Sequence, residues 1–598
     1  MVTASDSRKT PPGPPTGSRI LVVGGGYVGM YTALRLQRKL KQRLRSGDTE
    51  IVVVTPEPYM TYQPFLPEAA AGSISPRHVV VPLRRVLSHC TIVIGEARSV
   101  DHAKRTASVV TLATDEEGTG SREIAYDELV IAPGSVSRTL PVPGLAEHGI
   151  GFKTIEEAIG LRNHVIEQMD IASATRDPAI RDAALTFVFV GGGYAGVEAL
   201  AELEDMARYT SRYYHNIRAD DLKWVLVEAT ARILPEVGEA MGEYAIRELR
   251  GRNIDVRLDT RLESCEDRTA VLSDGARFPT RTVVWTAGVK PAPLLAATDL
   301  PLTERGRLRC TPHLAVQGVD HAWAAGDAAA VPDLTAAEDR GGAQGGGRSE
   351  GRGMGRTGAV GDTPPTTAPN AQHAVRQAKL LADNIVASLS GEPLKEYRHA
   401  YVGSVASLGL HKGVAHVYGR KIKGYPAWLM HRAYHLSRVP TFNRKARVLA
   451  EWTLAGLFKR EIVSLGSLEH PRAEFQLAAG SKPPISGPPN GKRPISNRPI
   501  SKHPNGNHPK DKAPNGKHPT DRGPDTAHPD RGRRPDTDRP DTDRGPGTDR
   551  PVTGGPANGL PGSGFQDDRP YGLPDDRSPE PPKGRRPEDR RPEDTEGN

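Results

Sequence analysis

The sequence predicts an α/β protein with two parallel-sheet domains, and three observations carry this prediction. A strand, a glycine turn and a helix follow one another near residue 19, and a closely similar segment recurs near residue 186. Apolar runs at 129–135 and 283–289 form a second matching pair. A further strand-like run places Asp327 at its end, before an expected helix. In this order the segments outline two interleaved domains.

Composition separates a foldable part of the chain from a tail. The chain has 598 residues with a formal net charge of +8, enough for roughly two to four domains. Residues 471–598 hold 26 of the 53 prolines and only three aromatic residues. We expect this tail, and the proline-rich stretch 1–17, to be disordered, because neither can bury enough apolar surface to offset its ordering entropy.

The cysteines and the hydropathy exclude several classes of protein. Cys90, Cys265 and Cys310 are far apart and fit neither a disulfide framework nor a zinc module. The N-terminus lacks the apolar stretch of a secretory signal, and no run approaches the roughly 20 apolar residues of a membrane span. We therefore expect a cytoplasmic protein whose membrane contact, if any, comes from one side.

The first glycine turn has the spacing of a dinucleotide site. The strand Ile20–Val23 leads into Gly24, Gly26 and Gly29 and then an apolar-periodic helix. In such a site the first glycine permits the turn, the second lets a pyrophosphate approach, and the third lets helix pack on strand. The pyrophosphate is held at the helix N-terminus by free N–H groups and the helix dipole.

The second turn repeats the first. The strand Phe187–Val190 precedes Gly191, Gly193 and Gly196, at the same spacing. A single GxGxxG is weak, but two glycine-rich turns without ligands would require the same coincidence twice. The sequence therefore predicts two dinucleotide sites.

Acidic residues after the following strands bear on which nucleotide binds. Glu228 ends a strand after the second turn, where a carboxylate accepts from a ribose hydroxyl and repels a 2′-phosphate. This favours NADH over NADPH, although Arg232 nearby would suit a phosphate. After the first turn the strand ends at Thr55, and the nearest carboxylate is Glu57, which leaves the ribose contact of that site open.

These elements resemble the flavoproteins with two dinucleotide-binding domains. The resemblance implies FAD in the first site, with Gly134, Gly326 and Asp327 assigned to it, and a nicotinamide cofactor in the second. The segment PEPYMTYQPFLPEAAAG has no cysteine where disulfide reductases carry a redox pair. Electrons would then pass directly from flavin to an acceptor. The predicted segments are the FAD domain at 18–150 and 291–400, the NADH domain at 151–290, and a low-complexity insertion at 338–369.

The helical segment 369–385 suggests the acceptor. Its AQHAVRQ is similar to the AQxAxxQ motif of type II NADH:quinone oxidoreductases, and FLPEAAAGSISPRHVVVPLR resembles that family's flavin-adjacent segment. The resemblance makes Gln372 and Gln377 quinone-site candidates, although Ala378 stands where many members have Gly. It also places Glu198 near the nicotinamide, in a positioning role. An ordinary amphipathic helix with exposed glutamines is the plain alternative.

The predicted C-terminal region, 401–470, contains a basic segment. From Lys412 to Arg460 there are eleven Lys or Arg and one acid, Glu451, interleaved with Trp, Leu and Phe. This pattern is typical of helices lying in a membrane interface, and membrane-binding C-terminal helices are also implied by the resemblance. Nucleic acid is the rival explanation, which we disfavour because the aromatics have aliphatic neighbours. A homodimer interface is the plain alternative.

The resulting prediction is a peripheral enzyme on the inner face of the cell membrane. Hydride passes from NADH to FAD and two electrons then pass to a membrane quinone, without proton pumping. No residue stands out in the sequence as a general acid. A soluble flavin reductase serving a ferredoxin-like protein and a redox-sensing scaffold are the two alternatives.

Overall fold

The computed structural model describes residues 17–111, 121–335, 365–399, 403–458 and 462–463. All of them belong to one compact unit, Met1–Gly491. The expected disorder at 1–17 and 471–598 concerns residues that, Gly17 excepted, lie outside this description.

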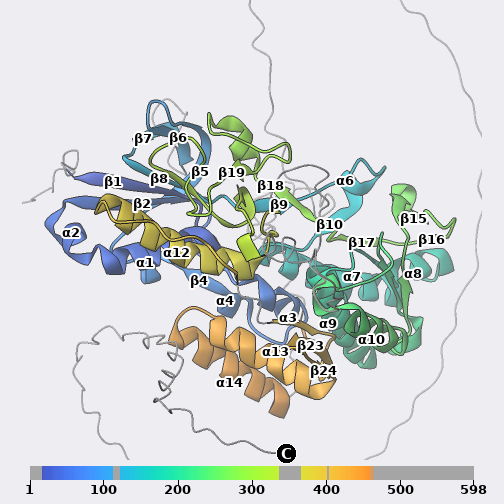
Figure 1. The fold of residues 1–598 in the computed structure, drawn as a ribbon. Coiled ribbons are helices and arrows are strands. Elements are labelled where there is room, and N and C mark those ends of the chain that lie inside the picture. The colour runs from blue at the N-terminus through green and yellow to red at the C-terminus, as the bar shows by residue number, and fades with distance from the viewer. Residues whose placement is uncertain (1–16, 112–120, 336–364, 400–402, 459–461, 464–598) are drawn as a thin grey trace, which may run out of the picture. The chain divides into compact units, whose positions relative to one another are not determined.

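The first sheet is seven-stranded and mostly parallel (Figure 1). Its strands, in spatial order, are β20 (Ala322–Ala324), β8 (Glu128–Ile131), β1 (Ser18–Val23), β2 (Thr49–Thr55), β5 (Thr91–Asp101), β6 (Thr106–Thr111) and β7 (Ser121–Ala125). Neighbours from β20 to β5 pair in parallel, and β6 and β7 add an antiparallel edge. The inner strands are rich in Val and Ile because both of their faces are covered.

The second sheet has five strands, all parallel. In spatial order they are β10 (Gly149–Gly151), β17 (Thr282–Trp285), β11 (Thr186–Val190), β12 (Lys223–Val227) and β13 (Ile254–Arg257). In the first sheet β1, which leads into a glycine turn, lies between β2, the next strand in the sequence, and β8, which comes much later. In the second sheet β11 lies in the same way between β12 and β17. Each glycine turn therefore lies at the topological switch point, where α/β sheets bind ligands.

Helices cover these sheets. Those that position the site are α1 (Tyr27–Lys39), α3 (Leu66–Ala70), α7 (Ile155–Ala174), α9 (Tyr194–Thr210), α10 (Glu239–Arg250) and α12 (Ala371–Leu389). Helices α1 and α12 lie side by side (Figure 1), and the Thr32 hydroxyl donates to the Ala378 carbonyl at 3.3 Å. Ala378 is fully buried at this contact. Smaller helices are α2 (Lys41–Ser46), α4 (Pro76–Val79), α5 (Leu83–Val86), α6 (Leu145–His148) and α8 (Pro178–Ala184).

The basic C-terminal region is only partly helical. It begins with a three-stranded antiparallel sheet, β22 (Gly403–Ser407), β23 (Gly413–Val417) and β24 (Arg420–Lys423), and continues with α13 (Tyr425–Arg438) and α14 (Phe442–Phe458). Two helices thus lie in the segment where basic amphipathic helices were expected, but a sheet that the sequence did not predict precedes them. The glycines at 409, 413, 419 and 424 explain the difference, because they favour turns over a continuous helix.

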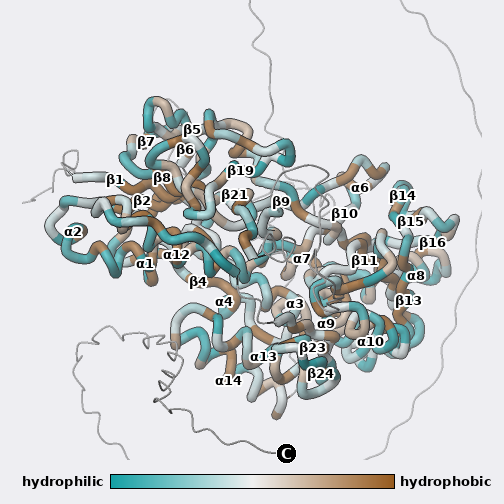
Figure 2. The backbone as a smooth tube through the Cα atoms, viewed as in Figure 1, coloured by the Kyte–Doolittle hydropathy of each residue, from teal (hydrophilic) through white to brown (hydrophobic). Residues whose placement is uncertain are grey.

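The remaining strands form small sheets and edges. They are β3 (Tyr59–Thr61) with β4 (Val80–Pro82), β9 (Ser135–Ser137) with β18 (Val289–Pro291), β19 (Leu308–Arg309) with β21 (Ala329–Ala330), and β14 (Leu262–Ser264), β15 (Thr269–Leu272) and β16 (Arg277–Pro279) together. Figure 2 shows the backbone around β8 as hydrophobic and the exposed helix α2 as hydrophilic. Two large apolar clusters form the core, each built around one of the main sheets.

The predicted insertion 338–369 includes residues that are part of the fold. Most of it lies outside the described residues, but Pro365 to Pro369 are described. The amide of Asp333 donates to the Pro365 carbonyl at 2.7 Å, and the amide of Thr367 donates to the Val331 carbonyl at 2.9 Å. The last residues of the predicted interval are therefore bonded to the residues just before it, a pairing that the glycine-rich composition does not indicate.

Candidate functional site

The first glycine turn has the geometry that its predicted role requires. Gly24 has a φ of +110°, and a Cβ there would collide with the Ala132 carbonyl in the turn after β8. A Cβ on Gly29 would collide with the Gly24 carbonyl, so α1 approaches β1 this closely only with glycine. At Gly26, which precedes α1, a Cβ would meet nothing within 4 Å.

The second turn reproduces this arrangement with one additional residue, Thr286. Gly191 has a φ of +117°, and a Cβ there would lie 2.7 Å from the Thr286 hydroxyl. A Cβ on Gly196 would collide with the Gly191 carbonyl, whereas one on Gly193 would meet nothing within 4 Å. Thr286 donates to the Val190 carbonyl at 2.9 Å, and its place in the segment VVWTAGV after β17 was the signal that could have identified it.

Open space at Gly26 and Gly193 fits the pyrophosphate of a dinucleotide. Each residue is the N-cap of its helix, α1 or α9, and neither helix has a side-chain cap. The first-turn N–H groups therefore remain available to an anion, which the helix dipole also attracts. The glycines with close neighbours allow two backbone segments to approach, and Gly26 and Gly193 leave space for a pyrophosphate. Both turns therefore suit the predicted cofactors.

The Glu228 carboxylate is hydrogen-bonded to the backbone of the second turn. One carboxylate oxygen accepts from the Gly192 amide at 2.6 Å, and the other accepts from the Thr230 amide at 2.9 Å. At the matching end of β2 stands Thr55, whose hydroxyl donates to the Glu57 carbonyl at 3.1 Å. Glu57 is largely exposed, but partial desolvation and repulsion by Glu156 raise the pKa of its carboxyl group. The two turns thus differ in charge beside the glycines.

Asp327 lies in a hydrogen-bonded row with two residues that the sequence did not single out. It follows β20, as expected, and lies in a short 3-10 turn, Gly326–Ala328, but the strand β21 follows where a helix was expected. The Lys153 ammonium donates to the Ser135 hydroxyl at 2.7 Å, and Ser135 donates to Asp327 at 2.6 Å. Burial lowers the pKa of Lys153, although Asp327 and Glu157 partly oppose this. Ser135 directly follows Gly134, whose Cβ would meet open space.

The two candidate glutamines have different surroundings. Gln377 is fully buried, accepts from the Gly326 amide at 2.8 Å and donates to the Thr367 hydroxyl at 3.1 Å. Gln372 is half-buried, and its amide donates to the Gly403 carbonyl at 3.4 Å. Five residues on a helix correspond to about 140° of rotation, so the two side chains leave α12 in different directions. That spacing could have been read from the sequence.

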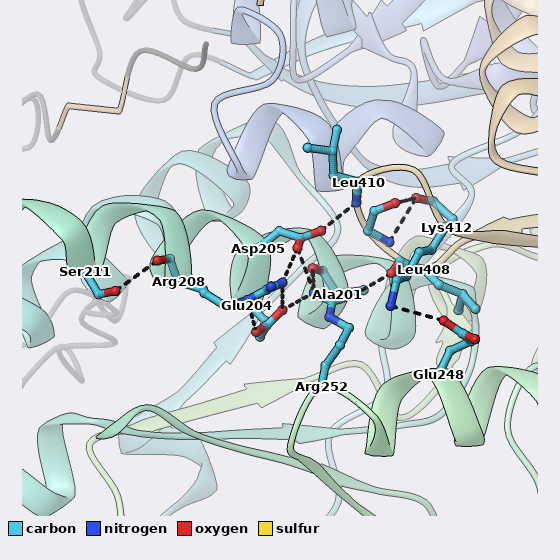
Figure 3. Close-up of polar contacts among 12 residues, drawn as sticks. Ala201, Glu204, Asp205, Arg208, Ser211, Glu248, Arg252, Leu408, Leu410 and Lys412 are labelled. Atoms are coloured by element: carbon cyan, nitrogen blue, oxygen red, sulfur yellow. Dashed lines mark hydrogen bonds and ion pairs between the residues drawn. The ribbon is translucent and has the colours of Figure 1, made fainter. Parts of the chain in front are cut away.

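Glu198 faces the C-terminal region. Its side chain is buried, accepts from the Ser407 amide at 2.9 Å and pairs with His431 of α13 at 3.1 Å. Just beyond Ser407, a network of charges fixes the loop 408–412 to α9 (Figure 3). Arg252 donates to the Leu408 carbonyl at 2.6 Å and pairs with Glu204, and Asp205 accepts from the Leu410 amide at 2.5 Å.

A second set of buried polar residues joins α3 to the C-terminal helices. Glu68 of α3 accepts from the Trp452 indole at 2.6 Å and lies 3.5 Å from the Arg432 guanidinium. The Arg432 guanidinium also lies over the rings of Trp428 and Trp452. Glu68 and His431 were not predicted from the sequence, although the histidines four residues apart on α13, at 431 and 435, were a signal that could have indicated the second of them.

The cysteines take no part in this site. All three are free thiols, and Cys265 and Cys310 are buried. Burial raises the pKa of Cys90 and of Cys310 to about 12 and, with nearby Glu147 and Glu266, that of Cys265 to about 11. Protonated and separated thiols cannot serve as a redox pair.

The last helix carries an exposed apolar surface. Val448 and half-buried Trp452 of α14 face the protein. The exposed large apolar side chains of α14 are Phe442, Leu449, Leu454, Leu457 and Phe458. In the part of the chain that the structure describes, no helix has the length and apolarity to cross a membrane.

Known proteins of similar sequence and fold cover most of the chain. It is 26% identical over 463 residues to the type II NADH:quinone oxidoreductase Ndh of Mycobacterium tuberculosis. The aligned region covers 75% of this chain and 90% of that protein. It is 30% identical over 443 residues to the demethylphylloquinone reductase NdbB of Synechocystis, spanning 73% and 95%. Among solved structures, NDH2 from Plasmodium falciparum in complex with NADH has a TM-score of 0.64 at 16% identity, covering 75% of this chain and 99% of that one.

A family model covers the two dinucleotide sites together. Residues 13–378 match the model described as pyridine nucleotide-disulphide oxidoreductase, whose members bind FAD and NAD(P)H. The match includes both glycine turns and extends to Gln377 of α12. Together with the NdbB relationship, these findings show that the chain belongs to the pyridine nucleotide-disulphide oxidoreductase family.

Proposed function

We propose that the chain is an FAD-dependent oxidoreductase that transfers electrons from NADH to a membrane quinone. The observation that carries the proposal is the pair of glycine turns, each open at one glycine, in a chain whose three cysteines are separate free thiols. Relatives named type II NADH:quinone oxidoreductase in Mycobacterium tuberculosis and in Staphylococcus aureus support it.

The first turn is the proposed FAD site. Gly24, Gly26 and Gly29 would hold the pyrophosphate at α1, and the row formed by Asp327, Ser135 and Lys153 offers polar groups to the rest of the cofactor. FAD, when bound, supplies the chemistry that accepts a hydride and returns two electrons. Gln377 contributes by holding the Gly326 amide beside Asp327.

The second turn is the proposed NADH site. Gly191, Gly193 and Gly196 would hold the pyrophosphate at α9, and Glu228 supplies negative charge where a 2′-phosphate would lie. Repulsion there favours NADH over NADPH. Glu198 lies four residues after α9 begins, so its buried contacts with Ser407 and His431 position this end of the site against the C-terminal region.

Gln372 is the proposed quinone contact. Its side chain is half-buried and leaves α12 toward the carbonyl of Gly403, at the start of β22. Gln377, by contrast, has both polar atoms occupied by the protein, which favours a positioning role. A quinone approaching from a membrane would meet the C-terminal region first, because β22 and α13 belong to it.

The proposed membrane surface is the outer face of α14. Exposed Phe442, Leu449 and Leu457 lie on it, and Arg447, whose side chain is also exposed, is on the same helix. Apolar side chains enter the headgroup boundary while basic groups meet anionic lipid, which is how interfacial helices bind. We place the protein on the inner face of the cell membrane on this basis.

The deciding experiment is NADH oxidation by FAD-loaded protein with a short-chain ubiquinone or menaquinone analogue. Parallel reactions replace NADH with NADPH and add or omit anionic vesicles. We expect rapid, NADH-specific turnover that rises with vesicles. Prompt bleaching of the flavin by NADH without quinone turnover would overturn the acceptor assignment and favour a protein acceptor.

A further inference from the structure

A row of titratable side chains connects the two dinucleotide turns through α13. His431 pairs with Glu198 at 3.1 Å, and its ring centroid lies 4.5 Å from that of His435, one helical turn away. His435 Nδ1 is 3.2 Å from the Tyr62 hydroxyl. The Tyr62 ring lies 6.2 Å from that of Tyr27, the residue after Gly26.

Both ends of this row reach the proposed cofactor sites. Tyr27 begins α1 and Glu198 lies near the start of α9. Next to Tyr62, the Gln63 side chain donates to the Lys153 carbonyl at 3.3 Å, and the Lys153 ammonium belongs to the row with Asp327. Contacts of Tyr62, Gln63 and Lys153 thus lead from His435 to the proposed flavin cradle.

Acidic groups surround His431, whereas no acidic side chain among the described residues pairs with His435. Burial alone would lower the pKa of His431, but Glu198, Glu68 and Glu202 together raise it. Burial and the neighbouring His431 hold the pKa of His435 well below its usual value. The other titratable groups around the two histidines and Tyr62 are Tyr27 and Tyr31 of α1, and Arg432, Tyr434 and Arg438 of α13.

The two rings therefore differ in how they hold a proton. A charged His431 beside a carboxylate stores one, and a neutral His435 can accept at one nitrogen while donating from the other. His431 Nδ1 is buried and has no hydrogen-bond partner among the described residues, and the two ring centroids are 4.5 Å apart.

We propose that His431 and His435, with Glu198 as the charge partner, deliver the proton that quinone reduction requires. The inference rests on the proposed function. Quinone becomes quinol by gaining two electrons and two protons. Bound FAD, once reduced, would supply both electrons and one of these protons, so one proton remains for the protein to supply. It passes from His435 to the quinone oxygen, His431 reprotonates His435, and bulk water restores His431.

The kinetic test compares two acceptors in the full-length, FAD-loaded enzyme. Short-chain ubiquinone takes up protons on reduction, whereas ferricyanide takes up electrons alone. We expect His435→Phe, which keeps a ring against Tyr62, and His431→Gln, which can still bond Glu198, to lower quinone turnover about 100-fold. Ferricyanide turnover should stay within about twofold. The control His215→Phe, at an exposed and distant histidine, should change neither rate.

The pH dependence and a spectroscopic measurement separate proton delivery from a structural role. Quinone turnover should fall as pH rises through the pKa of His431, and Glu198→Gln should move that fall to lower pH because it removes the charge that raises this pKa. Nitrogen-15 NMR of labelled histidines should show the same shift in the unreacted protein. Equal loss with both acceptors, or an unshifted pH profile in Glu198→Gln, would overturn the proposal. If wild-type enzyme failed to reduce quinone, the proposed function itself would be wrong.

Discussion

At the scale of single residues, glycines that look alike in the sequence differ in what surrounds them. Gly24 and Gly29 are enclosed by backbone, but Gly26 opens on space at the start of α1. The first two are needed for the chain to fold, and the third is needed only for a ligand to approach. Substitution therefore distinguishes folding from binding within one turn of six residues.

Gly26→Val should give folded but colourless protein. Gly26 has a φ of −75°, which valine tolerates, so the side chain would occupy the proposed pyrophosphate space without strain. The FAD-to-protein ratio from the visible spectrum, measured with thermal unfolding, tests this. Gly29→Val is the matched comparison and should fail to fold, because its side chain meets backbone. A yellow Gly26→Val protein would contradict the assignment of the site.

The two glutamines of α12 give a second comparison. Gln372→Leu should cut quinone turnover far more than ferricyanide turnover, because its amide is proposed to face the acceptor. Gln377→Leu should instead lower stability by about 1–3 kcal/mol and weaken FAD retention, since it leaves the buried Gly326 amide unpaired. Steady-state kinetics and urea denaturation of both variants test this. Equal losses with both acceptors in Gln372→Leu would make that residue structural.

At the scale of elements, the loop between β22 and β23 is held by charge. Arg252 and Glu204 are almost fully buried, and Asp205 completes their network (Figure 3). Gly409 has a φ of +92°, and a Cβ there would collide with Asp205, so the network requires glycine at this position. This loop adjoins Ser407, whose amide binds Glu198, so the network also fixes one end of the proton row.

Arg252→Met should destabilise the protein by roughly 1–3 kcal/mol, because it removes the more buried of the two arginines that pair with Glu204 and Asp205 and leaves only Arg208 beside them. Arg247→Met is the matched control on the neighbouring helix. Its pair with Glu243 is exposed and 3.9 Å long, so its loss should cost less than about 0.5 kcal/mol. Urea denaturation of both variants gives the comparison, and similar midpoints would show that the network adds no stability.

At the scale of the whole molecule, the exposed face of α14 predicts how the protein meets a bilayer. Replacing both Leu449 and Leu457 with Gln should weaken binding to anionic vesicles at least tenfold, because roughly 1.5–3 kcal/mol of transfer free energy is lost for each buried leucine. Vesicle co-sedimentation measures this. Leu140→Gln, at a leucine 42% exposed in a distant loop, is the control. Unchanged binding of the double variant would exclude this face.

The sequence predicted those parts of the fold that depend on residues close together in the chain. The glycine spacing predicted both turns, and the helical period predicted α12. What the sequence did not show were pairings over long separations, such as Glu198 with His431 and Glu68 with Trp452. These depend on how β22 to β24 and the last two helices return to α3 and α9. Basic charge hid that region's sheet, because charge pattern indicates a surface and not a secondary structure.

The two ends of the glycine-rich insertion have a practical consequence. Val331 and Asp333 on one side are bonded to Thr367 and Pro365 on the other, so the fold closes before the insertion begins. Loop-closure entropy grows only slowly with length. The interval between Thr335 and Pro365 is therefore a natural place for a fluorescent tag or an affinity peptide. A reporter there would leave the Gln377 contact beside Asp327 in place, and it would make the protein visible in cells without altering either terminus.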